Sequence, residues 1–246
     1  RCYLNKVTRP NNSVINCFLA CLLLQASQTV ATPFSLTPYL ADYKVSRNGK
    51  KIGTGIRELR KQQDGRWHFL SQTKAKLFIF KDERTDTSVY SIKDGELKSL
   101  EYSHLRQGTG SDKAFHYEFN HQEKKIINKK DNVDLPLVWK NRFDELNYQH
   151  QLKKDIAEGK QHMAYDILGK KGKDKHYTFK VSGRETLNLP FGKIETIKIT
   201  RIRRDSDRQT VIWLAPKMEY LLVKLQQLKK GKEQALLELN HVEFKH

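Results

Sequence analysis

Residues 176–200, HYTFKVSGRETLNLPFGKIETIKIT, decide the fold class of this 246-residue chain. Apolar and polar side chains alternate along residues 177–181 and again along 197–199, and Pro190-Phe191-Gly192 lies between these two segments. Alternation with a period of two is typical of strands that bury one face, and glycine after proline favours a tight turn. The stretch therefore predicts two antiparallel strands joined by a short turn.

The same pattern recurs along the rest of the chain. Residues 115–119 and 221–225 alternate in the same way, and turn signals such as Asn48-Gly49 and Asp94-Gly95 fall between the alternating segments. Asn-Gly and Asp-Gly supply the positive φ angles that tight hairpin turns require. We expect a mainly β fold, a single large antiparallel meander of ten or more strands. Because strands twist, a sheet of that size curls into a barrel or half-barrel.

Two segments depart from the alternating pattern. Apolar residues within 141–156 lie near helical spacing, and Glu158-Gly159 follows them, which predicts one helix near 141–156 packed against the sheet. Residues 76–82, KLFIFKD, form a short apolar run with a lysine on either side. This run fits either a strand or a short plug of the barrel.

The first 31 residues differ in composition from the rest of the chain. They carry three basic and no acidic residues, and an apolar run covers 14–24. That run is too short to span a bilayer and has the length of a secretory signal sequence. We expect a signal peptide at 1–31, cleaved between Ala31 and Thr32, and a single β-rich periplasmic domain at 32–246. An alternative is an outer-membrane lipoprotein in which Cys21 carries the lipid.

Charge and cysteine content restrict the function further. The net charge of +18 falls to +15 for residues 32–246, and the three cysteines all lie in the first 21 residues. Disulfide scaffolds and thiol nucleophiles are therefore excluded for residues 32–246. Such a basic chain would ordinarily suggest nucleic acid, but an exported protein does not meet it as a regular ligand. We expect no nucleic acid and no membrane-spanning segment, and an anionic envelope component as a partner.

Three segments together resemble a bacterial exported family known as domain of unknown function 3108. Tyr39-Leu40-Ala41-Asp42-Tyr43-Lys44-Val45 resembles its opening hairpin, and residues 185–199 resemble its segment around a Pro-x-Gly turn. Val211-Ile212-Trp213-Leu214-Ala215-Pro216, followed by residues 220–224, resembles its ending. The resemblance covers nearly all of 36–244. It implies a periplasmic, β-rich protein, and it implies no reaction.

The sequence offers little support for catalysis or metal binding. None of the nine histidines forms an H-E-x-x-H motif, and there is neither a G-x-S-x-G elbow nor a phosphate-binding loop of the G-x-x-x-x-G-K type. We therefore predict a non-enzymatic protein without cofactor or metal.

The remaining signal is a set of aromatic residues on strand faces. We expect them to line a barrel interior that holds a lipid or acyl chain. These candidate lining residues are Trp67, Phe69, Phe115, Tyr117, Phe119, Tyr177, Phe179 and Trp213. Two alternatives remain open: a structural or assembly factor that docks on anionic envelope surfaces through its basic exterior, and a hydrolase acting on an envelope polymer.

Overall fold

A computed structural model describes residues 34, 36–204 and 206–245. Cys21, Ala31 and Thr32, and with them the predicted signal peptide at 1–31, lie outside the described residues. No helix among the described residues is long and apolar enough to cross a bilayer.

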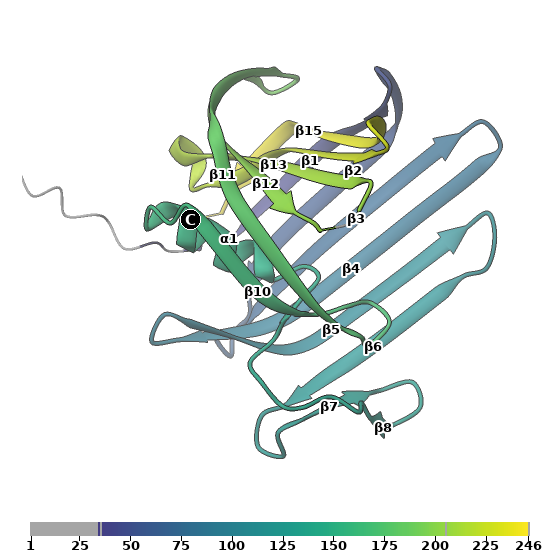
Figure 1. The fold of residues 1–246 in the computed structure, drawn as a ribbon, viewed down its shortest axis with the longest axis vertical. Coiled ribbons are helices and arrows are strands. Elements are labelled where there is room, and N and C mark those ends of the chain that lie inside the picture. The colour runs from purple at the N-terminus through teal and green to yellow at the C-terminus, as the bar shows by residue number, and fades with distance from the viewer. Residues whose placement is uncertain (1–33, 35, 205, 246) are drawn as a thin grey trace, which may run out of the picture. The chain divides into compact units, whose positions relative to one another are not determined.

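One sheet contains all the strands that the structure describes (Figure 1). In chain order they are β1 (Tyr39–Arg47), β2 (Lys50–Lys61), β3 (Trp67–Leu77), β4 (Phe80–Lys93), β5 (Glu96–Gly108), β6 (Lys113–Asn120), β7 (Lys125–Asn128), β8 (Val133–Asp134), β9 (Phe143–Asp144), β10 (His162–Leu168), β11 (Asp174–Leu189), β12 (Gly192–Ile202), β13 (Arg208–Ala215), β14 (Leu221–Lys229) and β15 (Lys232–Phe244). A short 3₁₀ helix, Pro216–Met218, connects β13 to β14.

The order of strands in the sheet is β8-β7-β6-β5-β4-β3-β2-β1-β15-β14-β13-β12-β11-β10-β9. Neighbours pair antiparallel throughout, except that β9 and β10 are parallel. The first and last strands, β1 and β15, therefore pair in the interior of the order, and the two edge strands, β8 and β9, come from the middle of the chain. The sheet is curled and not closed, which confirms the predicted mainly β fold.

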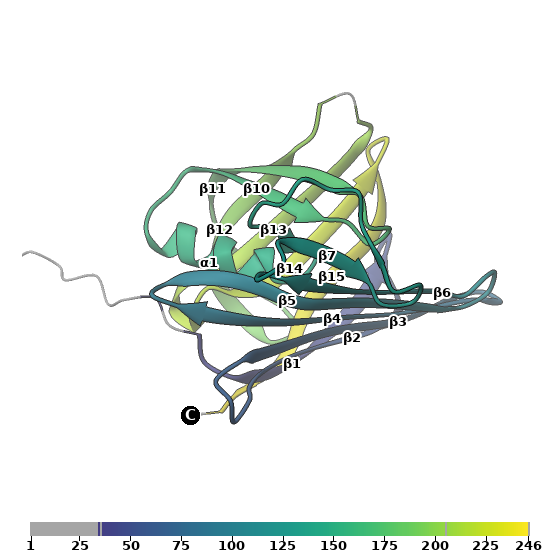
Figure 2. The ribbon, with the colours of Figure 1, turned by 90° about the horizontal axis from the view of Figure 1, so that it is seen from below.

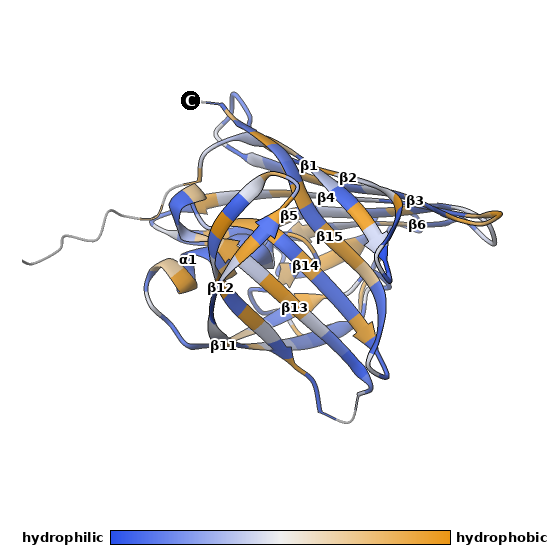
Figure 3. Cartoon of the chain, turned by 90° about the horizontal axis from the view of Figure 1, so that it is seen from above, coloured by the Kyte–Doolittle hydropathy of each residue, from blue (hydrophilic) through white to orange (hydrophobic). Residues whose placement is uncertain are grey.

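The core lies on the concave side of the sheet. Along β1, Tyr39, Ala41 and Tyr43 are buried while the residues between them are partly exposed, as the period of two requires. Leucine, isoleucine and valine together are the most numerous core residues, and aromatic rings such as Phe69 and Tyr90 are almost completely enclosed among them. Figure 3 shows the resulting alternation of hydrophobic and hydrophilic residues along the strands.

Helix α1 (Tyr148–Ala157) packs on this concave side and contacts both halves of the sheet (Figure 2). Gln149 at its start accepts a hydrogen bond from Arg57 of β2, and Asp155 near its end accepts one from Tyr165 of β10. The helix predicted near 141–156 is present, but it begins seven residues later. The side chain of Asp144 accepts hydrogen bonds from the two backbone N–H groups of residues 146 and 147, so the chain turns there instead of continuing as a helix.

Residues 76–82 form neither a buried plug nor a separate strand. They make the end of the β3–β4 hairpin, in which Leu77 pairs with Phe80 and Lys76 with Lys81. The apolar side chains of this hairpin end are largely exposed to solvent.

Candidate ligand groove

A groove of about 600 Å³ lies on the concave side of the sheet, between β1–β4 and β11–β15. The segment at the start of α1 forms part of its wall through Leu146, Tyr148 and Gln149. Ligand sites for small molecules in proteins usually have volumes of roughly 300–1,000 Å³. The groove is therefore large enough for a ligand of that size.

One part of the groove is apolar. It is lined by side chains from adjacent strands of the curled sheet, all of them on the inward face. These are Val45 of β1, Ile52 of β2, Ala75 and Leu77 of β3, Phe80 of β4, Leu225 and Leu228 of β14, and Ala235 and Leu237 of β15. An alkyl chain bound along this part would remove from water both its own apolar surface and that of the groove.

The other part is basic. Arg57 of β2, Arg201 of β12, Arg203 just after β12 and Arg208 of β13 all line it. Within the described part of the chain, no carboxylate lies within 4.0 Å of any of these four guanidinium groups. They form an unpaired arginine cluster, and a concentration of positive charge of this kind attracts an anion.

Arg57 is the most deeply buried member of the arginine cluster, with 5% of its surface exposed. Its Nη1 donates to the side-chain carbonyl of Gln149 at 2.6 Å, and its Nε has no hydrogen-bond partner. The guanidinium carbon also lies 5.8 Å from the ring centroid of Tyr43. A neutral amide and an aromatic ring are weak compensation for a buried charge. The side chain is therefore poised to accept an anionic partner.

Arg201 and Arg203 lie close to two tyrosines. The guanidinium carbon of Arg201 lies 3.2 Å from the ring centroid of Tyr177, and the Nε atoms of both arginines lack a partner. Arg203 Nη2 donates to Thr210 at 3.3 Å. Burial and the positive charge of Arg201 lower the pKa of Arg203. These like charges repel one another, and an anion between them would remove that repulsion.

Tyr148, at the first turn of α1, faces the same arginines. Burial raises its pKa to about 12, and the charge of Glu145 adds to this shift. The positive charges of Arg201, Arg57 and Arg203 act in the opposite direction. Three arginines from two halves of the sheet thus converge around one buried phenol.

The acidic residues of the groove already have partners. Asp86 of β4 accepts hydrogen bonds from Tyr102 at 2.6 Å and from Lys170 at 3.2 Å, and it contacts His104 Nδ1 at 2.9 Å. Burial acts to raise the pKa of Asp86, but these contacts outweigh it and hold the pKa below its usual value. Through Lys170, this carboxylate connects β4 to the β10–β11 turn.

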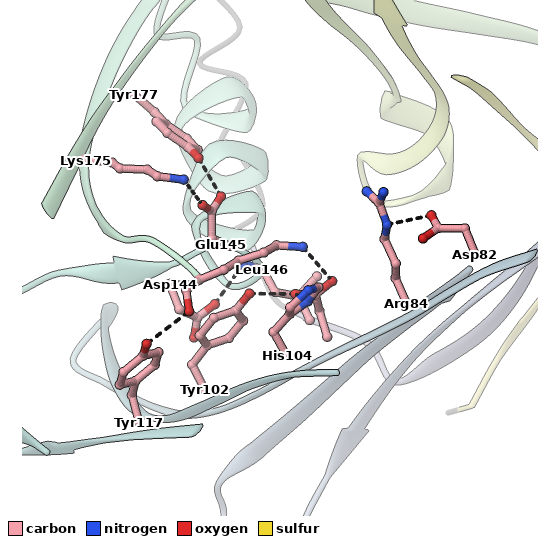
Figure 4. A network of polar contacts seen from close by, with 12 residues as sticks. Asp82, Arg84, Tyr102, His104, Tyr117, Asp144, Glu145, Leu146, Lys175 and Tyr177 are labelled. Carbon is pink, nitrogen blue, oxygen red and sulfur yellow. Dashed lines mark hydrogen bonds and ion pairs between the residues drawn. The ribbon is translucent and has the colours of Figure 1, made fainter. Parts of the chain in front are cut away.

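Glu145 makes a second such contact with β11. Tyr177 donates to its carboxylate at 2.5 Å and Lys175 at 2.6 Å, and Figure 4 shows both side chains directed at it. Asp82 is paired with Arg84 and Arg106. These acids therefore neutralise other lysines and arginines, and the four arginines of the cluster have no ion pair with a described carboxylate.

Of the eight aromatic residues predicted to line a cavity, Tyr177 lines the groove. Phe115 is half-buried and stacks on His104. The other six are buried in the hydrophobic core: Trp67, Phe69, Tyr117, Phe119, Phe179 and Trp213.

The arginine cluster was not predicted from the sequence, although the sequence contains one signal of it. Arg57 falls between Gly55 and Leu59 on the buried face of β2, where alternation calls for an apolar side chain. The basic residues at 201–204 also form a visible run. Their convergence with Arg57 depends on the curling of the sheet. The described residues contain no group of three or more His, Cys, Asp or Glu side chains that could hold a metal ion.

Comparisons with known proteins identify one matching family and one solved structure of similar fold. The sequence pattern of the family described as "Protein of unknown function (DUF3108)" matches residues 39–238. No curated protein matches the chain by sequence. The beta-barrel-like protein of domain of unknown function DUF1849 from Brucella abortus is similar in structure, with a TM-score of 0.61 at 9% identity; the match covers 87% of this chain and 100% of that one.

Weaker structural similarity extends to two further proteins. A putative exported protein with YmcC-like fold from Bacteroides fragilis has a TM-score of 0.34 at 11% identity, with 85% of this chain and 97% of that one covered. The complex of MucA and MucB from Pseudomonas aeruginosa has a TM-score of 0.34 at 13% identity, covering 88% of this chain and 54% of the other.

Proposed function

The chain belongs to the family described as protein of unknown function (DUF3108), and from this premise we propose that it is a non-enzymatic binding protein for an amphipathic anion. The ligand is an acyl chain that ends in a carboxylate or a phosphate. Its chain lies along the apolar part of the groove, and its head group is bound by the arginine cluster. The family carries no activity with its name, so the proposal rests on the geometry of the groove.

The unpaired arginine cluster is the observation that carries this proposal. Removing a guanidinium group from water costs several kcal/mol unless a counter-charge is present. Carboxylates and phosphates match the fork of arginine N–H donors, and they bind it more strongly than neutral acceptors do. The neighbouring apolar side chains offer apolar surface that the rest of the ligand can cover. The arginine cluster can therefore bind the head group, and the apolar part of the groove can bind the chain.

The polar network around Asp86 supports the non-enzymatic part of the proposal. A His–acid pair is present, because His104 contacts Asp86 at 2.9 Å. However, His104 is itself buried and its ring stacks on Phe115. The carboxylate also binds Tyr102 and Lys170. We assign this network to fixing the β10–β11 turn against β4, a structural role.

We place this binding in the bacterial cell envelope. The pattern of residues 1–31 supports this location, as does the excess of basic residues in the rest of the chain. The phospholipids of that compartment's membranes carry acyl chains and a phosphate, which makes the proposed ligand class available there.

Substitution of Arg57 tests the proposal. We expect Arg57→Met to weaken binding of a fluorescent fatty acid at least tenfold, because the head group loses a charged partner in a buried site. Arg60→Met is the matched control, since Arg60 is on the same strand but is exposed and pairs with Glu58. The thermal midpoint of Arg57→Met should be equal to or higher than that of the wild type, because a buried charge is replaced by an apolar side chain.

Two results would overturn the proposal. The first is that Arg57→Met and Arg60→Met reduce the affinity for the fatty acid by the same factor. The other is equal affinity for the fatty acid and for the corresponding fatty alcohol, since the alcohol lacks the charge that the arginine cluster recognises.

A further inference from the structure

The end of the β3–β4 hairpin exposes three consecutive large apolar side chains. Phe78 is 85% exposed, Ile79 is 81% exposed and Phe80 is 58% exposed. Figure 3 shows the hydrophobic colouring at the far end of this hairpin. Single exposed apolar residues are common on soluble proteins, but a contiguous exposed group marks a surface that another body covers. We call residues 76–81 the apolar tip.

The apolar tip extends past its neighbours in the sheet. Pairing between β2 and β3 ends at Gly53 with Ala75, and pairing between β4 and β5 begins at Asp82 with Gly108. The last two residue pairs of the hairpin, in 76–81, therefore have no strand pairing on either side. Figures 1 and 2 show the turns of the β3–β4 and β5–β6 hairpins at the side of the sheet that lies away from α1. Two hydrogen bonds connect the backbone of Lys81 to Thr109 of the β5–β6 loop, and residues 77–80 extend beyond this connection.

The turn itself carries residues that are unfavourable for a turn. Phe78 has a positive φ of 55°. Bulky side chains rarely adopt this conformation, and Asn, Asp and Gly are preferred in it. Other hairpins of the same sheet follow that preference, as Asn48-Gly49 and Asp94-Gly95 do. Phenylalanine at position 78 raises the backbone cost, and Phe78 and Ile79 together raise the exposed apolar area. Neither cost is compensated within the described chain.

Basic side chains surround the apolar tip. Lys76 and Lys81 flank the apolar residues, and the β1–β2 turn brings Lys50 and Lys51 to the same end of the sheet. None of these four lysines forms an ion pair with a described carboxylate. Exposed apolar side chains next to lysines that have no described acidic partner are complementary to a surface with an apolar interior and anionic groups at its boundary. An anionic lipid bilayer has both properties.

We propose that the apolar tip inserts into the surface of an anionic bilayer. The side chains of Phe78, Ile79 and Phe80 enter the boundary between head groups and acyl chains, and the surrounding lysines contact the lipid phosphates. Leu77 and Phe80 also line the groove, so insertion would bring one end of the groove to the membrane surface. This docking role goes beyond the proposed ligand binding and is tested separately from it.

The depth of the tip can be measured directly with tryptophan. In the full chain, Ile79→Trp places a fluorophore at the tip, and Lys93→Trp places one at the β4–β5 turn, at the other end of the same hairpin strand. Vesicles contain phosphatidylglycerol and phosphatidylcholine, with lipids brominated along the acyl chain as quenchers. After subtraction of the wild-type signal, which Trp67, Trp139 and Trp213 supply, we expect a blue shift and at least twofold quenching of the added tryptophan in Ile79→Trp, and neither in Lys93→Trp. Both proteins share residues 1–33, so any binding by that segment contributes equally.

A double substitution, Phe78→Asn with Ile79→Gly, keeps the hairpin and removes the apolar residues. It installs the turn residues that Asn48-Gly49 uses, so the thermal midpoint should be unchanged or higher. We expect its affinity for the anionic vesicles to fall at least tenfold, and wild-type affinity to fall on vesicles of phosphatidylcholine alone. Arg60→Met should insert normally, because Arg60 pairs with His68 at the end of β2 that lies away from the tip.

Three outcomes would overturn the docking proposal. The first is equal quenching of Ile79→Trp and Lys93→Trp. The second is unchanged vesicle binding by the double variant together with unquenched Ile79→Trp. The third is association of the tip with a second copy of the chain, seen as a dimer in solution that the double variant abolishes while vesicles leave the tip unquenched.

Discussion

Asp144 provides the sharpest test of how the start of α1, and with it one wall of the groove, is held in place. Its side chain is completely buried. It accepts hydrogen bonds from Ser88 at 2.5 Å, from the backbone N–H of Leu146 at 2.8 Å and from that of Asn147 at 2.7 Å. Burial raises the pKa of this carboxyl from 3.8 to about 7, although the three hydrogen bonds act in the opposite direction.

The sign of the pH dependence follows from this pKa. Between pH 3.8 and about 7 the folded protein keeps the proton on Asp144 while the unfolded chain has released it. The free energy of unfolding therefore decreases as the pH rises through this range, and the loss is complete above it. At ~1.4 kcal/mol for each tenfold change in proton affinity, the contribution reaches ~4 kcal/mol.

Two substitutions separate the charge from the hydrogen bonds. Asp144→Asn keeps acceptors for the two backbone N–H groups and cannot ionise, so its stability relative to the wild type should rise between pH 5 and pH 8. Asp144→Ala loses all three hydrogen bonds and should be less stable than Asp144→Asn, which keeps the two backbone bonds, by ~2 kcal/mol at pH 5, at ~1 kcal/mol for each bond.

Urea unfolding followed by tryptophan fluorescence at pH 5, 6, 7 and 8 measures these differences. Groups other than residue 144 titrate in both proteins, so the difference between wild type and Asp144→Asn isolates this residue. Parallel stability curves for the two proteins would refute the reasoning, because they would mean that Asp144 titrates alike in the folded and unfolded states.

Two further predictions concern stability elsewhere in the fold. Gly53→Ala should lower the free energy of unfolding by ~2 kcal/mol, because a Cβ at this position would lie 1.9 Å from the carbonyl oxygen of Lys74. Gly55→Ala is the control, since the nearest contact of its Cβ would be at 3.5 Å, and it should change the free energy of unfolding by ~0.5 kcal/mol or less. Urea unfolding measures both variants, and equal losses of stability would contradict the prediction. Burial lowers the pKa of Lys153 from 10.5 to about 7, so wild-type stability should increase as the pH rises from 7 towards 10.5, and Lys153→Met should lack this increase when unfolding is compared at pH 7 and pH 9.

Much of the fold could be predicted from local pattern, because a period of two and Asn-Gly or Asp-Gly turns act within a few residues. The start of α1 could not. Residues 141–147 have apolar positions at helical spacing, but the side chains of Asp144 and Asn147 bond to the backbone of their own loop and stop the helix there. The turn at 78–79 was equally hidden, because Phe-Ile is not a turn sequence.

The candidate site shows the same limit more clearly. Alternation identifies which side chains point inward, but it does not say whether they pack against others or line a space. Phe179 and Tyr177 belong to the same strand face, yet Phe179 lies in the core and Tyr177 lines the groove. Arg57 stands out in the sequence as a charge on an inward position. Its proximity to Arg201 follows only once strands far apart in the chain face one another.

The pairing of β1 with β15 has a consequence for how the molecule is made. A chain synthesised from its N-terminus has all of β1 available early, but the partner of its free side, β15, is made after all the other described strands of the sheet. Until then β1 and β14 are both open edges, the state in which sheets join to other chains. Loss of β15, which has thirteen residues, would leave those two edges open permanently. Nascent and truncated chains of this protein should therefore depend on chaperones far more than the finished molecule does.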